Sequence, residues 1–229
     1  MHIEVVDFIA GARAARGIAV VIDVFRAFSV EAYAFARGAT LSIPVAEIAE
    51  AKQLKFANPA AILIGERHAK PLPGFDCGNS PSELERIDVK GCTLIHTTHS
   101  GTQGLVNAID AEEVITGALV NCAAIVRYLR TRRPAFVTLV RMGHEARERC
   151  DEDDLCAELI GVRLRGGELD VAGIGARLRR AKSAQKFFDP DCDWAPERDF
   201  DLCVALDIHN FVLRLDRTES PPVLRRIEV

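Results

Sequence analysis

Short apolar runs alternate with helix-like segments along most of this chain, and that alternation restricts the fold more than any other feature. The run Ile18–Ile22 is apolar throughout, which is typical of a strand covered on both faces. Further strand-like runs cover 39–43, 60–64, 92–96, 113–116 and 135–140, and helix-like segments cover 26–37, 45–57, 101–109, 121–131 and 152–164. The alternation predicts an α/β fold: a three-layer α/β/α sandwich with a mainly parallel, mixed sheet.

The pattern changes in the last third of the chain. There we expect two short helices within 169–188, a helix over 197–206 and a strand over 211–215 at a sheet edge. We therefore predict one α/β domain over 1–229, with a helical C-terminal subregion at about 166–210. A chain of 229 residues is long enough to bury such a core without disulfides or metals.

Composition and charge exclude several classes of protein. The net charge is −4, so the basic excess typical of a nucleic-acid groove is absent. No apolar run approaches the roughly 18 residues of a membrane span, and the N-terminus lacks a signal-peptide pattern. Seven cysteines occur without a Cys-x-x-Cys pair, which is typical of reduced thiols. We predict a cytoplasmic protein that binds neither nucleic acid nor membrane, and a homodimer remains open.

Polar side chains follow four of the strand-like runs. They are, in chain order, Asp23 and Arg26, Glu66 and Arg67, the hydroxyl-rich turn Thr97–Thr102, and the segment Arg141–His144. Ligands of open parallel sheets bind beyond the carboxyl ends of the strands. We therefore expect all four groups to lie on one rim of the sheet and to form a single site.

The segment Gly74–Pro81 places a carboxylate just before the start of a helix. Ser80 can cap that helix, Pro81 fits its first position, and Glu83 completes a capping box. Free backbone N–H groups at such a helix start attract phosphate, while the carboxylate of Asp76 can bind a cation. Together these features predict a metal-assisted phosphate site.

Several of these residues also have purely structural interpretations. Asp23 is either a Mg²⁺ ligand or catalytic carboxylate, or else a helix cap or the ion-pair partner of Arg26. Arg26 and Arg67 either grip a phosphate with forked hydrogen bonds or form surface ion pairs. The turn 97–102 either lets an oxyanion reach backbone N–H groups or simply caps the following helix.

The acidic run 151–154 and the histidines leave further alternatives. The run favours the positive end of a helix dipole, and Asp154 could in addition join the site. The histidines His68, His96, His99 and His144 match no zinc-ligand spacing, so the sequence does not predict a zinc site. We expect His99 and His144 to be the two that reach the rim of the sheet.

Six segments, spanning about residues 18 to 210, carry a family resemblance. They are Val21–Ala27, Gly65–Arg67, Gly74–Pro81, Thr97–Thr102, Glu152–Ala157 and Cys203–Asp207. In these motifs the chain resembles the 2-phosphosulfolactate phosphatase family. The resemblance implies a three-layer α/β/α fold and a small phosphorylated or sulfonated acid as the substrate. It also implies Mg²⁺-dependent hydrolysis of the phosphate ester of 2-phospho-3-sulfolactate, a step toward coenzyme M.

The resemblance also implies roles for individual residues. Asp23, Glu66 and Asp76 would bind Mg²⁺, and the catalytic residues would be Asp23, Arg26, Arg67 and Asp76. Substrate would be bound by Asn79, Ser80, Thr97, Thr98, Ser100, Gly101 and Thr102. The chain departs from the family pattern at His99 and Ser100, in the linker His68–Pro71 and at Arg141–Glu145. These departures line the expected pocket, so they bear on the choice of substrate.

Two chemical routes and two other functions stay open. Asp23 could form an aspartyl-phosphate, or the metal could activate a water molecule. The main alternative function is a non-catalytic binder of a small anionic metabolite on the same rim. A nucleotide-binding module ranks last, because the chain has neither Gly-x-Gly-x-x-Gly nor a Walker A loop.

Overall fold

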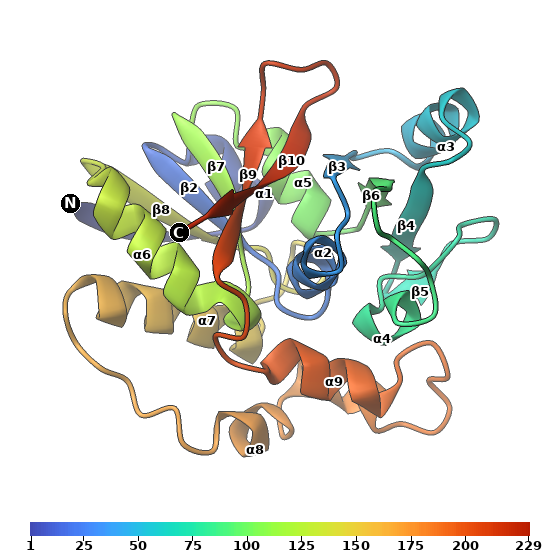
Figure 1. The fold of residues 1–229 in the computed structure, drawn as a ribbon. Helices are drawn as coiled ribbons and strands as arrows, with labels where there is room; N and C mark the ends of the chain where they lie inside the picture. The colour runs from blue at the N-terminus through green and yellow to red at the C-terminus, as the bar shows by residue number, and fades with distance from the viewer.

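A ten-stranded mixed sheet runs through the computed structural model, which describes residues 1–229 (Figure 1). Its strands, in spatial order, are β1 (His2–Asp7), β8 (Phe136–Arg141), β2 (Ile18–Ile22), β7 (Glu113–Gly117), β9 (Phe211–Asp216), β10 (Val223–Glu228), β3 (Leu41–Pro44), β6 (Thr93–Thr97), β4 (Ile62–Arg67) and β5 (Lys70–Pro71). Most neighbouring pairs are parallel. The predicted α/β class with a mainly parallel, mixed sheet is confirmed.

An antiparallel hairpin divides this sheet into two parallel groups. The first group is β1, β8, β2 and β7, and the second is β3, β6 and β4. The hairpin β9–β10 pairs with the first group only at Ile115↔Arg214 and with the second only at Leu224↔Ser42. The strand expected over 211–215 at a sheet edge is therefore central. That expectation was wrong because the final residues form β10, which the sequence pattern did not reveal and which gives β9 a second neighbour.

Helices cover both faces of the sheet (Figure 1). They are α1 (Phe8–Ala14), α2 (Ala27–Ala36), α3 (Ile48–Ala57), α4 (Pro81–Leu84), α5 (Gly101–Asn107), α6 (Cys122–Arg132), α7 (Asp151–Leu164), α8 (Ile174–Leu178) and α9 (Glu197–Val204), with 3₁₀ turns η1 (Leu119–Asn121) and η2 (Lys182–Phe187). The helical segment expected in the C-terminal part is thus α8, η2 and α9. No helix is long and apolar enough to cross a membrane.

Alternate residues of the strands supply different hydrophobic cores. Val20 packs into a core with residues of α6 and α7, whereas Val21 packs into a second core with residues of α1, α2 and α5. In the second group, Leu63 and Ile64 likewise point to opposite cores. Because both faces are covered, every position of such strands is buried, which explains their unbroken apolar runs.

Helix α2 joins the two parallel groups. It is buried along nearly its whole length, and its buried Glu31 carboxylate contacts the Ser42 hydroxyl and the His96 ring. Phe28 and Phe35 pack into the core of the first group, and Val30 and Ala34 pack into a core of the second. Figure 1 shows the helix between the two groups of strands. The turn that precedes α2 therefore sits where the two groups meet.

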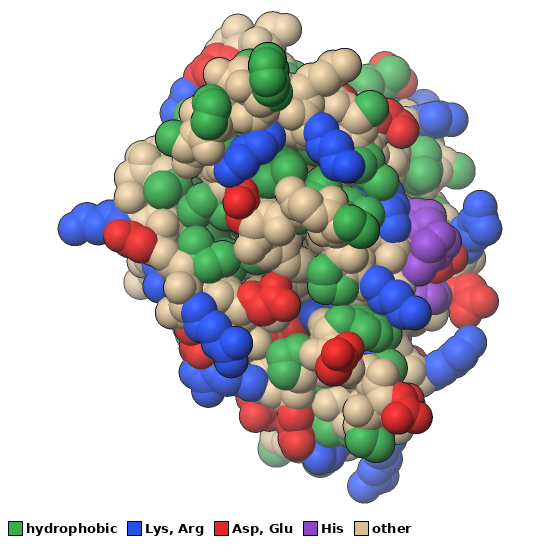
Figure 2. Space-filling model, turned by 90° about the vertical axis from the view of Figure 1, so that its right-hand side faces the viewer, with side chains coloured by type: hydrophobic (Ala, Val, Ile, Leu, Met, Phe, Trp, Pro, Cys, Tyr) green, Lys and Arg blue, Asp and Glu red, His purple; other side chains and the backbone are tan.

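Charged side chains of both signs are interspersed on the face that carries β4 and β5 (Figure 2). No continuous basic groove crosses this face, in keeping with a net charge of −4.

The packing of the hairpin predicts the effect of one truncation. Leu224→Ala should lower the free energy of unfolding by about 2–5 kcal/mol, because the side chain is fully buried and its loss leaves a cavity. The matched control is Val229→Ala at the exposed end of the chain, which should change that energy by less than about 0.5 kcal/mol. Denaturant unfolding followed by circular dichroism measures both. Equal effects of the two substitutions would contradict this packing.

Candidate active site

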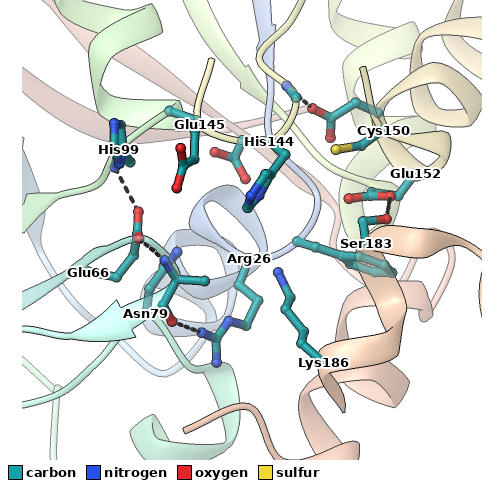
Figure 3. Close-up of a pocket in the computed structure, with 16 residues that line it drawn as sticks. Arg26, Glu66, Asn79, His99, His144, Glu145, Cys150, Glu152, Ser183 and Lys186 are labelled. Atoms are coloured by element: carbon teal, nitrogen blue, oxygen red, sulfur yellow. Dashed lines mark hydrogen bonds between the residues drawn. The ribbon is translucent and has the colours of Figure 1, made fainter. Parts of the chain in front are cut away.

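A small polar pocket lies where the two parallel groups meet (Figure 3). The loops after β2, β4, β6 and β8 supply much of its wall, together with α7 and η2. It is lined by Asp23, Phe25, Arg26, Glu66, Ala69, Asn79, His99, Ser100, Gly143, His144, Glu145, Cys150, Glu152, Asp153, Ser183 and Lys186. The predicted convergence of four strand ends is thus observed, although the ends belong to two groups of strands rather than to one continuous parallel sheet.

The inner pocket is much smaller than the cavity beside it. It holds about 40 Å³, whereas the neighbouring cavity, which shares Ala69, His144, Cys150, Ser183 and Lys186, holds about 250 Å³. The inner space suits an ion or a water molecule, and the outer one can take the body of a small organic acid.

Arg26 is fixed by a buried ion pair. One of its terminal nitrogens donates to Asp199 at 2.8 Å and to the Trp194 carbonyl at 3.0 Å, and the other donates to the Ala69 carbonyl at 3.0 Å. Neither the Arg26 nor the Asp199 side chain is more than 2% exposed. Because a buried guanidinium needs a counter-ion and hydrogen-bond acceptors, this network determines where Arg26 points.

Asp199 also organises the start of α4. Its second oxygen accepts from the Ser80 hydroxyl at 2.9 Å and from the Ser82 backbone N–H at 3.0 Å. The expected cap is present, since the Glu83 backbone N–H donates to the Ser80 hydroxyl. Sequence reasoning did not identify Asp199, because Asp199 and Asp201 both flank Phe200 and only the rotation of the helix shows which of them is buried.

Asp23 is buried at the end of β2. One oxygen accepts a long hydrogen bond of 3.4 Å from the Ala27 N–H, and Gly101 leaves room for the other. A Cβ at position 101 would come within 2.9 Å of that oxygen. Burial, followed by the charge of Glu66, raises the pKa of Asp23 to about 7. The ionised carboxylate is therefore costly here unless a cation accompanies it.

Two further carboxylates come from the start of α7. Asp153 accepts from the Val24 N–H at 2.9 Å and from the Gly143 N–H at 2.8 Å, and Glu152 accepts from the Ser183 hydroxyl at 2.6 Å. Burial raises the pKa of both, and the charge of Asp23 raises that of Asp153 further. The pocket therefore concentrates negative charge in a poorly solvated place.

Asp154, the residue expected to join the site, points elsewhere. It pairs with Arg141 at 3.0 Å and with Arg149 at 2.7 Å, near the surface. Successive residues of a helix are about 100° apart, so only one side of the acidic run can face the pocket. Its neighbour Asp153 occupies that side.

Glu66 and Asn79 complete the polar wall on the side of the second group. The carboxylate of Glu66 accepts from the N–H groups of Ala69 and His99, both at 2.7 Å. Asn79 is only 5% exposed, and its side-chain oxygen is buried without a hydrogen-bond partner. An unpaired buried oxygen is costly, so it marks a place where a donor or a cation would be stabilised.

Lysine, cysteine and histidine side chains surround these oxygens (Figure 3). Lys186 reaches into the pocket, where burial and then Arg26 lower its pKa. Burial raises the pKa of the Cys150 thiol, which keeps it protonated at neutral pH and argues against a thiolate nucleophile. His99 and His144 both line the pocket as predicted, and partial burial lowers the pKa of His99.

The structure brings together only part of the predicted site. Asp23, Arg26, Glu66, Asn79 and Ser100 line the pocket. Arg67 and Asp76 do not. Arg67 donates to the Ala46 carbonyl and the Thr97 hydroxyl, while Asp76 is bound by the Lys55 ammonium at 2.7 Å and the Leu63 N–H at 2.8 Å.

Most of the remaining predicted residues lie outside the pocket lining and shape the backbone around it. Ser80 is occupied by Asp199 and by its helix cap. Thr98 and Thr102 hydrogen-bond to each other and so shape the turn that begins α5, and Thr97 receives Arg67. Gly101 allows the close approach of Asp23. Ser100 lines the pocket, but its hydroxyl accepts from the Ala146 N–H at 2.9 Å.

The geometry defines a class of enzyme. Clustered carboxylates that can hold a divalent cation, placed beside a fixed arginine and a lysine, are what phosphoryl-transfer enzymes use to neutralise a reacting phosphate. These are the groups that hydrolysis of a phosphate monoester requires.

Comparison with known proteins gives the family. A family model described as 2-phosphosulpholactate phosphatase matches residues 5–218. A Thermotoga petrophila protein named "Probable 2-phosphosulfolactate phosphatase" is 38% identical over 171 residues, which cover 75% of this chain and 69% of that protein. A protein of the same name from Thermoplasma acidophilum is 28% identical over 195 residues, or 85% of this chain and 84% of that protein. The chain belongs to the 2-phosphosulpholactate phosphatase family.

The raised pKa of Asp23 predicts a pH effect on stability in the presence of a chelator. Between the ordinary value of 3.8 and about 7, the folded chain holds this proton and the unfolded chain does not. Folding is therefore stabilised at the acidic end of this window, and stability falls as the pH rises through it. Asp23→Asn should reduce the drop in melting temperature between about pH 5 and about pH 7.5. An unchanged or larger drop would contradict the buried carboxylate.

The Arg26–Asp199 pair predicts a second result. Asp199→Ala should lower the free energy of unfolding by about 3–5 kcal/mol, because Arg26 stays buried without a counter-ion. The control is Asp201→Ala on the exposed side of the same helix, expected within about 0.5 kcal/mol of the unmodified chain. Denaturant unfolding measures both values. A loss for Asp199→Ala as small as the control would show that the pair is dispensable.

Proposed function

We propose that this chain hydrolyses the phosphate ester of 2-phospho-3-sulfolactate, or of a closely similar small acid, in a reaction that depends on Mg²⁺. The observation that carries the proposal is the group of buried carboxylates around Asp23, which faces Arg26 and Lys186 across one pocket. An anionic ester can approach these carboxylates only when a cation offsets their charge. The names of the relatives supply the substrate.

The donor atoms of the pocket fit Mg²⁺. Asp23, Glu66 and Asp153 offer carboxylate oxygens, and Asn79 offers its unpartnered amide oxygen. Mg²⁺ prefers hard oxygen donors and retains several of its waters. In this proposal Asp153 replaces Asp76, which the family resemblance implied as the third carboxylate ligand. When bound, the ion would supply positive charge against the oxygens of the phosphoryl group.

Arg26 and Lys186 would hold the phosphoryl group from the other side. Arg26 uses only part of its donor set on Asp199 and on two carbonyls, so further N–H groups are free for an oxyanion. Because the guanidinium is already fixed, little conformational entropy is lost when the ester binds.

The outer cavity suits the remaining acidic groups of the substrate. Its wall includes Arg149, Lys182 and Lys186. Arg149 pairs with Asp154 and Lys182 with Glu148, but the basic partners of both pairs are more than half exposed. Exposed ion pairs are weak, so a carboxylate or sulfonate can compete for these cations.

The chemical step can follow either of two routes. The Asp23 carboxylate attacks phosphorus and forms an aspartyl-phosphate that water later hydrolyses, or water attacks phosphorus directly. In both routes the leaving alkoxide takes a proton. Because the pKa of Glu152 is raised, its carboxyl group is suited to donate that proton. Acid quenching during turnover of a ³²P-labelled ester leaves label on the protein only in the first route.

We also propose that the protein is cytoplasmic. All seven cysteines are free, which suits the reducing cytoplasm. A homodimer stays a prediction that sedimentation would test.

Adjacent residues of α7 provide a matched test. Asp153→Asn should lower kcat for phosphate release by at least about 100-fold, because it removes a carboxylate from the pocket. Asp154→Asn should lower kcat by less than about 3-fold, because Asp154 lies outside the inner pocket and pairs with Arg141 and Arg149. The assay is Mg²⁺-dependent release of inorganic phosphate from 2-phospho-3-sulfolactate. Tight binding of the ester without any release would instead support a non-catalytic binder.

A further inference from the structure

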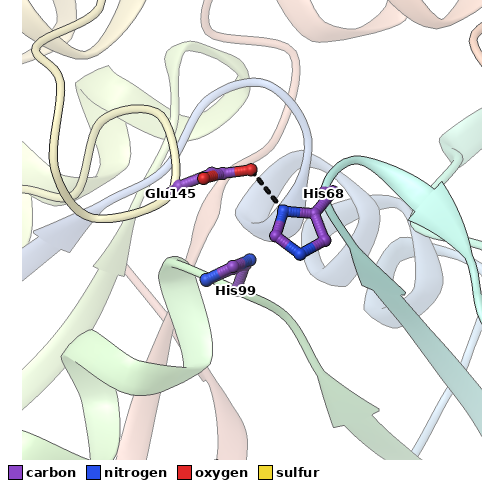
Figure 4. Close-up of side chains that lie close together, drawn as sticks. All are labelled: His68, His99 and Glu145. Carbon is purple, nitrogen blue, oxygen red and sulfur yellow. Dashed lines mark hydrogen bonds and ion pairs between the residues drawn. The ribbon is translucent and has the colours of Figure 1, made fainter.

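Three potential metal ligands meet at the junction of the two cavities (Figure 4). His68 follows β4, His99 follows β6 and Glu145 follows β8, so the three come from separate loops. Each offers one ligand atom, and these atoms all lie within 4.8 Å of one another. Glu145 and His99 line the inner pocket, while His68 lines the outer cavity.

Hydrogen bonding within this cluster pairs two of the side chains and leaves a nitrogen of the third without a partner. The Nδ1 atom of His68 lies 2.5 Å from the carboxylate of Glu145, and the rings of His68 and His99 are 4.8 Å apart at 71°. The Nδ1 atom of His99 is buried without a hydrogen-bond partner. A simple His68–Glu145 ion pair therefore accounts for two of the three side chains and leaves the third unexplained.

The backbone holds two of these residues in uncommon conformations. His68 has a φ of 54° and Glu145 a φ of 52°, and the alanine that follows each is also left-handed. Residues other than glycine adopt this region at a cost, and such conformations cluster at functional sites. Both loops thus present a side chain where glycine would be less strained.

The donor set matches zinc rather than Mg²⁺. Two imidazoles and one carboxylate are the protein ligands of several catalytic zinc sites, in which the fourth position stays open. Zinc–ligand distances near 2.1 Å place the ligands of a tetrahedral ion about 3.4 Å apart. The present spacings, from 2.5 Å to at most 4.8 Å, bracket that value. The His68 side chain is 69% exposed, so it can make the small adjustment required.

We propose that His68, His99 and Glu145 form a zinc-type metal site at the entrance of the pocket, separate from the oxygen-rich inner site. A bound ion would tie together three loops that belong to both parallel groups, with its open position toward the cavity. Ligand spacing along the chain could not reveal such a site, because the three residues come from three different loops.

Cobalt binding tests the proposal, since Co²⁺ occupies zinc sites and has visible absorption bands. The full chain is stripped with a chelator and titrated with Co²⁺ in excess Mg²⁺, which keeps the inner site occupied. We expect one equivalent to bind and then to be displaced by Zn²⁺. His99→Asn and Glu145→Gln should each weaken binding by at least about 10-fold. His2→Asn, at a histidine on β1 outside the pocket, is the matched control.

Two results would overturn the site. One is the absence of saturable binding at one equivalent, and the other is equal Co²⁺ affinity in His99→Asn, Glu145→Gln and the unmodified chain. Asp23→Asn should retain the Co²⁺ bands, and their loss in that variant alone would place the ion in the inner pocket instead. Thermal melts confirm that each variant folds. The readout is metal binding, so it is independent of whether the chain releases phosphate.

Discussion

The buried ion pair between Arg26 and Asp199 is the interaction on which the rest of the site depends. It joins the turn after β2 to α9, and Asp199 in turn holds the start of α4 through Ser80 and Ser82. Two opposite charges with almost no solvent contact are stable only when they pair with each other and hydrogen-bond to neighbouring groups. The helical C-terminal subregion is therefore part of the active site, because it supplies the counter-ion of an arginine more than 170 residues away.

Unlike this balanced ion pair, the inner pocket concentrates negative charge. Burial raises the pKa values of Asp23, Glu152 and Asp153, and the charges of neighbouring carboxylates raise those of Asp23 and Asp153 further. Such a cluster is unfavourable by itself, and the divalent cation proposed above would offset its repulsion. Hydrogen bonds from the backbone N–H groups of Val24 and Gly143 hold the Asp153 carboxylate in place despite this repulsion.

The sequence was most informative where the chemistry is local. Strand and helix alternation gave the fold class, and the residue types at strand ends pointed to Asp23, Arg26 and Glu66, which do meet. Asp199 was not foreseen, because its partner is distant in the chain. The carboxylate of Asp76 looked equally suitable, but Lys55 and a backbone N–H already bind it. Whether Asp153 or Asp154 faces the pocket depends on how α7 is rotated about its axis, and composition alone does not specify that rotation.

The connection between the two parallel groups has a mechanical consequence. Each group is joined to the central hairpin through a single rung of strand pairing, and the pocket walls come from both groups. Few backbone hydrogen bonds therefore cross from either group to the hairpin, whereas α2 packs into cores of both groups. The inner space of about 40 Å³ lies at this junction, and its walls come from loops of both groups. At this seam in the sheet, side-chain packing rather than strand pairing thus supplies most of the connection between the two halves of the pocket.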